Sequence, residues 1–195
     1  DVEANNPATD EGIYQKYDVK TLEKKKVNKL ELMKEMGLEP DENRMLIGMV
    51  SRLVDHKGLD LVRYIFHDMM GDNVSFVLLG SGDAEYESFF REMQNRYPGR
   101  VAVRIGFIPS LSKKIYAGAD AFLMPSKSEP CGLAQMVAAR YGTLPIVRET
   151  GGLKDSIHDV GGENGNGFTF KTYNAHDMLG AIRRAEGLFG NKALW

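Results

Sequence analysis

Short apolar segments alternate with helical patterns along most of the chain, and this alternation restricts the folds that the chain can adopt. The apolar segments are often β-branched and are predicted strands: residues 45–50, 74–79, 101–105, 121–124, 144–147 and 167–170. Helical patterns are predicted between and after them, at residues 59–70, 85–97, 110–117, 133–141 and 175–188. Because continuous apolar strands separated by helices are typical of a parallel sheet covered on both faces, the pattern predicts one doubly wound α/β domain.

The N-terminal part of the chain has a different pattern. Residues 1–18 contain an Asn-Asn-Pro-Ala-Thr-Asp stretch and little periodicity, which predicts an extended surface segment. A helix is expected at residues 21–36, ended by Gly37, with apolar residues at near-helical spacing: Leu22, Val27, Leu30 and Met33. The charged residues 23–26 are interpreted as a solvated face of this helix.

Composition excludes several classes of protein. A chain of 195 residues with a net charge of −2 can bury one core but lacks a basic surface, so no nucleic-acid partner is expected. The single cysteine, Cys131, cannot form an intrachain disulfide, which fits a reducing compartment. No apolar run approaches the roughly 20 residues that span a bilayer, so no membrane partner is expected. The first residues resemble neither a signal nor a transit peptide, and we expect the sequence to begin inside a longer protein.

Loops that follow parallel strands meet at the carboxyl edge of the sheet, where ligands bind in open α/β folds. Here these loops are residues 51–58, 80–83, 106–109, 126–132 and 148–153. They hold a disproportionate share of the glycines and several charged residues. A binding site is therefore expected at this edge.

The first three of these loops offer cationic and aromatic groups. Arg52 and Lys57 lie on one loop beside a helix start and are candidates to bind a diphosphate; the alternative is a solvated basic loop. Residues 80–83 form a glycine-rich turn, which a helix capped by Asp83 explains about as well as a phosphate contact. Phe107 follows a strand and is a candidate to stack on a nucleobase, with a core position as the alternative.

The loop at residues 126–135 carries the sharpest signal, because it joins a carboxylate to a helix start. Glu129 precedes Pro130, and the backbone N–H groups of Cys131, Gly132 and Leu133 follow as donors for an anion. Glu129 is alternatively a first-turn carboxylate favoured by the helix dipole. No residue nearby resembles a base for a Cys131 nucleophile, so a thiol mechanism is not favoured.

A second anion nest is expected at residues 150–153, where Thr150 precedes the paired glycines Gly151 and Gly152. A simple left-handed turn is the alternative. The histidines are scattered, and no spacing of histidine, cysteine and carboxylate residues suggests a zinc site.

Taken in order, these loops resemble the C-terminal domain of bacterial glycogen synthases and plant starch synthases, which are glucosyltransferases that use ADP-glucose. The motifs that carry the resemblance are residues 6–10 (NPATD), 51–58 (SRLVDHKG), 129–133 (EPCGL), 140–145 (RYGTLP) and 150–153 (TGGL). The resemblance extends over essentially the whole chain. Each is weak alone, and the set is specific.

The resemblance implies a fold of two Rossmann-like domains facing a cleft, the GT-B arrangement, with residues 1–195 as the C-terminal, donor-binding half and 1–18 as an interdomain or surface segment. The N-terminal domain, with its lysine-glycine-glycine loop, and the terminal crossover helix have no counterpart in this sequence. The family extends an α-1,4-glucan from ADP-glucose with retention at the anomeric carbon. No metal or other cofactor is expected, and we expect these residues alone to catalyse nothing.

The resemblance also implies a role for each candidate residue. Arg52 and Lys57 would neutralise the donor diphosphate and the leaving ADP. Glu129 would hold hydroxyls of the transferred glucose, and the backbone amides at residues 131–133 would support the sugar and the distal phosphate. Phe107 stands where the family places an aromatic residue, usually tyrosine, against adenine. Val137 stands where related retaining transferases often carry a second glutamate, which these synthases commonly lack.

Other functions remain open at this point. One is a related GT-B transferase that uses another nucleotide sugar or acceptor. Another is a non-catalytic nucleotide-binding module, since a doubly wound fold alone does not specify a function. Bacterial cytoplasm is the expected location, in preference to the plastid stroma.

Overall fold

The computed structural model describes residues 6–18, 20–126, 140–148 and 168–190. Its six strands form one parallel sheet in the order β3-β2-β1-β4-β5-β6. Their bounds are β1 Met45–Val50, β2 Val74–Gly80, β3 Val101–Ile105, β4 Ala121–Met124, β5 Leu144–Arg148 and β6 Phe168–Phe170. This is the Rossmann strand order, so the doubly wound prediction is confirmed. Each strand lies within one residue of its predicted bounds.

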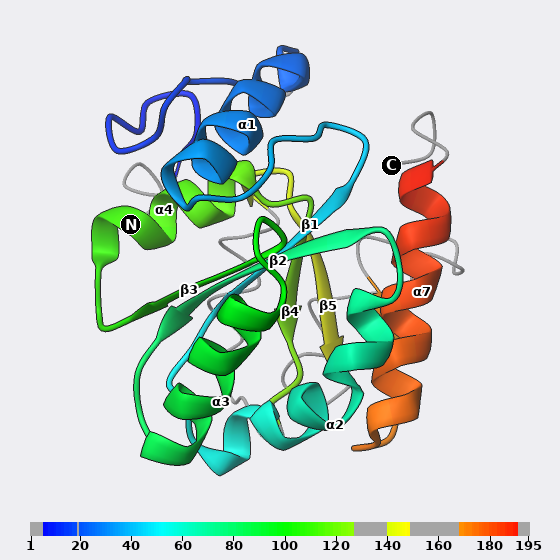
Figure 1. The fold of residues 1–195 in the computed structure, drawn as a ribbon. Coiled ribbons are helices and arrows are strands. Elements are labelled where there is room, and N and C mark those ends of the chain that lie inside the picture. Colours follow the sequence, from blue (N-terminus) through cyan, green and yellow to red (C-terminus); the bar gives the residue numbers. More distant parts are fainter. Residues whose placement is uncertain (1–5, 19, 127–139, 149–167, 191–195) are drawn as a thin grey trace.

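Helices cover both faces of the sheet. They are α1 Lys25–Glu35, α2 Leu59–Met70, α3 Ala84–Arg96, α4 Pro109–Gly118 and α7 Ala175–Gly190, with short 3-10 turns η1 Leu22–Lys24 and η2 Asp55–Lys57. α2, α3 and α7 pack on one face, while α1 and α4 pack together on the other (Figure 1). The helix predicted at residues 133–141 lies, except for its last two residues, outside the described residues.

The core follows from the two-residue period of the strands. Ile47 points toward α2 and Leu46 points toward α1, and both side chains are fully buried. The α2 face is the larger, and it includes an aromatic cluster in which the Phe66 ring lies 5.3 Å from that of Phe76 and 6.0 Å from that of Phe90. Edge-on ring pairs at such distances add to the stability gained from burial.

The prediction of an extended surface segment is wrong for the described part of residues 1–18. Residues 6–18 form turns, and the Tyr17 N–H donates to the Pro7 carbonyl at 3.0 Å, so the segment folds back on itself. Tyr17 is buried, and its hydroxyl donates to the Tyr141 carbonyl at 2.5 Å. The Tyr141 hydroxyl in turn donates to the buried Asp10 carboxylate at 2.5 Å. Aromatic burial thus holds the segment against the domain.

The predicted apolar face of the first helix is confirmed at Met33 and wrong at Val27. α1 buries Asn28, Lys29, Leu32 and Met33, whereas Val27 is 42% exposed. The residues interpreted as a solvated face include Lys25, whose amine donates to the Ala117 carbonyl at 2.6 Å and to the Thr143 hydroxyl at 2.8 Å. α1 packs on the chain through hydrogen-bonded cations as well as through apolar side chains.

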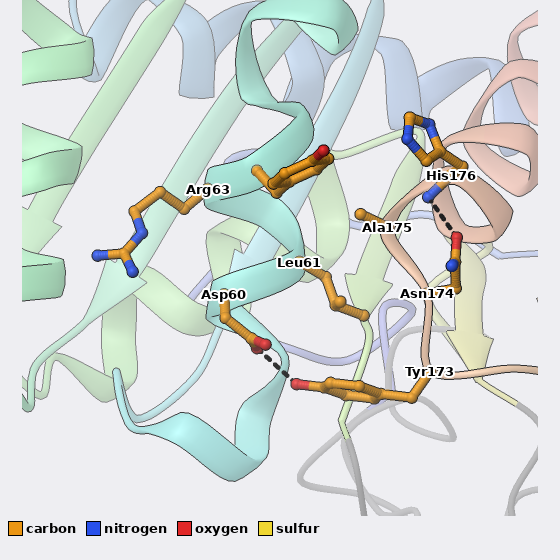
Figure 2. A pocket seen from close by; sticks show the side chains of 8 residues that line it. Asp60, Leu61, Arg63, Tyr173, Asn174, Ala175 and His176 are labelled. Carbon is orange, nitrogen blue, oxygen red and sulfur yellow. Dashed lines mark hydrogen bonds between the residues drawn. The ribbon is translucent and has the colours of Figure 1, made fainter.

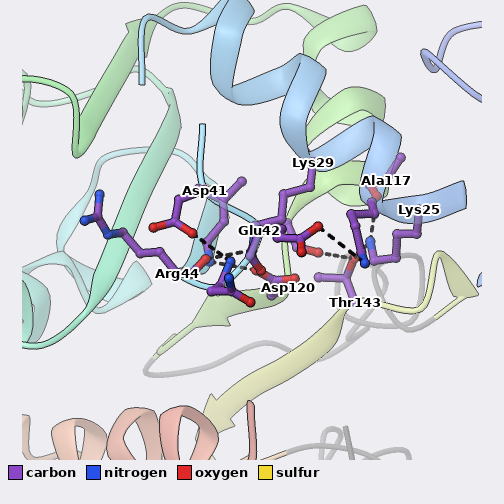
Figure 3. Close-up of polar contacts among 12 residues, drawn as sticks. Lys25, Lys29, Asp41, Glu42, Arg44, Ala117, Asp120 and Thr143 are labelled. Carbon is purple, nitrogen blue, oxygen red and sulfur yellow. Dashed lines mark hydrogen bonds and ion pairs between the residues drawn. The ribbon is translucent and has the colours of Figure 1, made fainter. Parts of the chain in front are cut away.

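These cations belong to a polar cluster at the amino edge of the sheet, made by Lys25, Lys29, Asp120 and Thr143 and called here the amino-edge network (Figure 3). Residues 120 and 143 directly precede β4 and β5. The Lys29 amine lies 2.8 Å from an Asp120 oxygen, and both side chains are almost fully buried. The same Asp120 oxygen accepts from the Leu46 N–H at 2.8 Å. The network therefore joins α1 to the first residues of three strands.

Candidate functional site

A cavity of about 540 Å³ lies at the carboxyl ends of β1, β2 and β3. We call it the sheet-edge pocket, and its lining residues are Val50, Ser51, Arg52, Leu79, Gly80, Ser81, Gly82, Gly106, Phe107, Ile108, Ser112 and Tyr116. Three of the loops that the sequence assigns to the ligand edge thus converge on one cavity. Two of the predicted site residues, Arg52 and Phe107, line it together.

Backbone pairing beyond the strands positions Arg52. The Leu53 N–H donates to the Ser81 carbonyl and the Asp83 N–H donates to the Leu53 carbonyl, each at 2.9 Å, so the loops after β1 and β2 run side by side. Their approach requires glycine, because a Cβ on Gly80 would lie 1.9 Å from the Ser51 carbonyl oxygen. Leu53 is buried while Arg52 is exposed, which leaves the guanidinium at the rim of a wall made largely of backbone.

Lys57 lies at the end of η2 on the same loop, half-buried and outside the lining of the sheet-edge pocket. The loop is held from two sides. The Tyr86 hydroxyl of α3 donates to the Asp55 carboxylate at 3.0 Å, and the Ser126 hydroxyl donates to the His56 carbonyl at 3.1 Å. Burial and the neighbouring Asp55 carboxylate raise the pKa of Tyr86 to about 12, so its hydroxyl stays protonated as a donor at neutral pH.

The loops after β1 and β4 meet where the strand order reverses, which is the ligand-binding crevice of this fold class. Gly58 ends η2 with φ +82°, a left-handed conformation that favours glycine. A Cβ at this position would also lie 2.3 Å from the Pro125 carbonyl oxygen. Gly58 therefore lets the Lys57 loop pack directly against the residue before Ser126, at the entrance to the loop that carries Glu129.

Phe107 is 90% exposed, so the alternative of a core position is wrong. It follows Gly106, whose N–H donates to the Gly80 carbonyl at 3.0 Å and ends the pairing of β3 with β2. The neighbouring Ile108 is 38% exposed and lines the same pocket. An aromatic ring with this exposure is available to stack on a planar ligand.

Two lining residues on α4, Ser112 and Tyr116, were not predicted from the sequence. They are four residues apart, so they lie on one face of the helix, beside the buried Leu111 and Ile115. That spacing was a usable signal. Burial raises the pKa of Tyr116 to about 12, so its phenol is neutral at physiological pH.

The glycine-rich turn at residues 80–83 differs from its predicted form in one respect. Asp83 occupies the N-cap position of α3, but its side chain makes no capping hydrogen bond. The Glu87 carboxylate instead accepts from the Gly82 N–H at 2.9 Å. The turn lines the sheet-edge pocket, which the sequence treated as a weak expectation.

The remaining predicted site residues lie outside the described residues: Glu129, Cys131, Gly132, Leu133, Thr150, Gly151 and Gly152. Their roles stay predictions. Within the described ranges, no group of three or more histidine, cysteine, aspartate or glutamate side chains is placed to hold a metal ion. No helix in the same part of the chain has the length and apolar character that a membrane crossing requires.

Comparison with known proteins agrees with the resemblance that the motifs predict. Residues 33–187 match the family Glycosyl transferases group 1. The chain is 49% identical over 197 residues to a glycogen synthase of Anoxybacillus flavithermus, and 49% identical over 195 residues to one of Clostridium acetobutylicum. These matches cover 100% and 98% of this chain but only 41% of either relative. The chain thus spans about two fifths of the length of these relatives.

Among solved structures, the catalytic domain of starch synthase IV from Arabidopsis thaliana, bound to ADP and acarbose, superimposes with a TM-score of 0.91 at 36% identity. That match covers 97% of this chain and 40% of the other. The glycosyltransferase WaaG matches with a TM-score of 0.63 at 16% identity, which shows a shared fold alone. The family match, the strand order and the pocket at the sheet edge agree, and the chain belongs to the glycosyl transferases of group 1.

Proposed function

We propose that this chain is the donor-binding half of a retaining glucosyltransferase that extends an α-1,4-glucan from ADP-glucose. The observation that carries the proposal is the convergence of Arg52 and Phe107 on one pocket at the carboxyl edge of the sheet. It is supported by the 49% identity to glycogen synthases and by the likeness to a starch synthase bound to ADP and acarbose. Bacterial cytoplasm stays the predicted location.

The sheet-edge pocket suits a nucleoside diphosphate. Its volume of about 540 Å³ lies within the range of small-molecule sites, roughly 300–1,000 Å³. The exposed Phe107 ring offers a surface for a purine, a contact worth about 1–3 kcal/mol when formed. Arg52 lines the pocket and Lys57 lies farther along the same loop; we propose that they offer a planar fork and a point charge to the phosphates.

In the proposed reaction the bond between the anomeric carbon of glucose and the diphosphate oxygen breaks, and ADP leaves with the electron pair. An acceptor hydroxyl bonds to that carbon and loses its proton. Negative charge grows on the diphosphate in the transition state, so cations aimed there stabilise it more than the ground state. Arg52 and Lys57 serve this purpose in the proposal without a metal. Glu129 is proposed to hold glucose hydroxyls.

The acceptor side of the cleft is proposed to come from the rest of a longer protein, since the chain spans 41% of its relatives. The 195-residue chain alone is then expected to be inactive. Incorporation of labelled glucose from ADP-glucose into glycogen by the purified chain would overturn this part of the proposal. Comparing the turnover of ADP-glucose, UDP-glucose and GDP-mannose by the longer protein tests the choice of donor.

The proposal is tested by replacing Arg52 and Lys57 separately with alanine in the longer protein. Each change is expected to lower kcat for glucose transfer by roughly 100-fold or more, because each removes a charge aimed at the leaving diphosphate. Arg91→Ala on the exposed side of α3 is the matched control and is expected to leave kcat unchanged. Near-normal turnover in Arg52→Ala or Lys57→Ala would contradict the proposal that these side chains neutralise the donor diphosphate.

A further inference from the structure

A second cavity, of about 680 Å³, lies between α2 and the start of α7 (Figure 2). We call it the α2–α7 pocket, and its lining residues are Asp60, Leu61, Arg63, Tyr64, Tyr173, Asn174, Ala175 and His176. It shares no residue with the sheet-edge pocket. Nothing in the proposed transfer reaction uses it.

Tyr64 is an exposed aromatic residue in the lining of this cavity, as Phe107 is in the lining of the sheet-edge pocket. It is 72% exposed, although α2 otherwise buries its large apolar side chains. Four large hydrophobic residues are exposed in the described part of the chain, and three of them line one of the two cavities: Tyr64, Phe107 and Ile108. The Tyr64 ring meets the His176 ring edge-on, with centroids 5.9 Å apart. Two rings from two helices therefore flank the cavity.

The polar groups around these rings are fixed in place. The Tyr173 hydroxyl donates to the Asp60 carboxylate at 2.5 Å, and Figure 2 shows this bond along one side of the cavity. The Asn174 side-chain oxygen accepts from the backbone N–H of His176 at 2.8 Å and from the backbone N–H of Asp177 at 3.2 Å. Since the oxygen of Asn174 caps α7, its amide nitrogen is left to donate to a ligand. The cavity thus offers planar acceptors and donors that need no reorganisation.

The charges of the lining favour a neutral ligand over a phosphate. Arg63 already pairs with Glu85 at 2.5 Å and lies over the Tyr86 ring, so its charge is balanced outside the cavity. The lining contains no lysine, and the Asp60 carboxylate would repel an anion. The first N–H groups of α7 are occupied by Asn174. A neutral ligand with many hydroxyls and an apolar face meets these conditions, and a sugar has both.

We propose that the α2–α7 pocket is a carbohydrate-binding site that holds a neutral α-1,4-linked glucan, with a glucose ring stacked on Tyr64 and hydroxyls bonded by Asp60 and Asn174. The identity of the sugar as glucan rests on the proposed function; the preference for a neutral sugar rests on the lining. A second binding site for the polymer on the same protein raises the effective concentration of the polymer at the reaction site, without any new contact at the reaction site itself.

The test is a titration of the 195-residue chain with maltoheptaose, followed by nuclear magnetic resonance and repeated with saturating ADP. Tyr64→Ala is expected to weaken maltoheptaose binding roughly 3- to 10-fold, while Tyr64→Phe, which keeps the ring, retains most of it. Asp68→Ala, on the same helix but outside the lining, is the matched control. ADP is expected not to compete.

Different outcomes separate this inference from the proposed function. Loss of maltoheptaose affinity in Tyr64→Ala with unchanged ADP affinity supports the site. If ADP fails to bind but maltoheptaose binding still depends on Tyr64, the proposed function fails and the carbohydrate site stands. If maltoheptaose does not bind, binds equally well to Tyr64→Ala and Asp68→Ala, or is displaced by ADP, the inference is overturned. Equal unfolding temperatures of the variants check that each is folded.

Discussion

The amino and carboxyl edges of the sheet are formed by opposite ends of the same strands, yet they differ in whether their functional groups are paired within the chain or exposed to solvent. At the amino edge, Lys29 is buried and forms an ion pair with the largely buried Asp120. At the carboxyl edge, Arg52 and Phe107 are exposed, and glycines bring the backbones of neighbouring loops together beneath them. Charges that are satisfied within the chain hold a fold together, whereas groups left toward solvent are available to a ligand. The comparison predicts that stability and binding can be changed separately.

The largest expected effect comes from breaking the buried ion pair. Asp120→Asn removes the charged partner of the Lys29 amine, which then keeps only the Glu42 and Arg44 carbonyls, and weakens an acceptor of the Leu46 N–H. Because an unpaired buried charge is costly, unfolding free energy is expected to fall by about 3–5 kcal/mol, measured by urea denaturation. Lys26→Met breaks the exposed pair with Glu42 and is expected to cost at most about 1 kcal/mol. Equal losses in both variants would contradict the assignment of stability to the amino-edge network.

A smaller loss is expected when the close packing of the carboxyl edge is disturbed. Gly58→Ala places a Cβ against the Pro125 carbonyl in a left-handed conformation and is expected to cost about 1–3 kcal/mol of unfolding free energy. Gly187→Ala is the matched control, because nothing lies near its Cβ in α7 and helix propensity favours alanine by roughly 0.5–1 kcal/mol. A Gly58→Ala variant as stable as wild type would show that the two loops are not held as described.

Lys25, in the amino-edge network, is expected to make the stability of the fold depend on pH. Burial, together with Lys29, lowers the pKa of its amine to about 7, while the unfolded chain keeps a value near 10. The unfolded state therefore binds more protons between these values, and stability is expected to rise with pH above about 7. Below that pH the amine is protonated in both states and the full cost of burial remains.

The measurement is chemical denaturation of wild type and Lys25→Met at pH 7 and pH 9. Wild type is expected to gain about 2 kcal/mol relative to Lys25→Met over this interval. The reference variant is needed because burial and Asp72 raise the pKa of Glu186 to about 8, which lowers stability as the pH rises to that value. An identical pH dependence in the two proteins would show that Lys25 does not titrate in this range.

The fold was predictable because its signals are local. The strands are continuous apolar runs, and the turns between them are marked by glycine, so their bounds are recovered within one residue. The placement of Arg52 at the ligand edge follows from its position after a strand. The amino-edge network was not predictable, because Lys25 bonds to the carbonyl of Ala117 and the hydroxyl of Thr143, which are remote in the sequence. A run of charged residues on a helix gives no sign of such partners.

The residues of the candidate site also differ in how far the sequence alone could predict them. Phe107 was ambiguous, because an apolar residue at the end of a strand faces either the core or solvent, depending on how the pairing ends. The fold resolves this in favour of solvent. Ser112 and Tyr116 become part of the site through the tertiary position of α4, although their spacing places them on one helix face.

The most direct test of a nucleotide site at the carboxyl edge is a titration of the 195-residue chain with ADP, followed residue by residue in ¹H–¹⁵N spectra. We predict that shifts gather at Arg52, at residues 80–82 and at Phe107, and spare the amino-edge network. Phe107→Ala is expected to weaken ADP binding roughly ten-fold, through lost stacking, with no change in unfolding temperature because the ring is 90% exposed. Shifts centred elsewhere, an absence of binding, or equal affinity in Phe107→Ala would contradict the account.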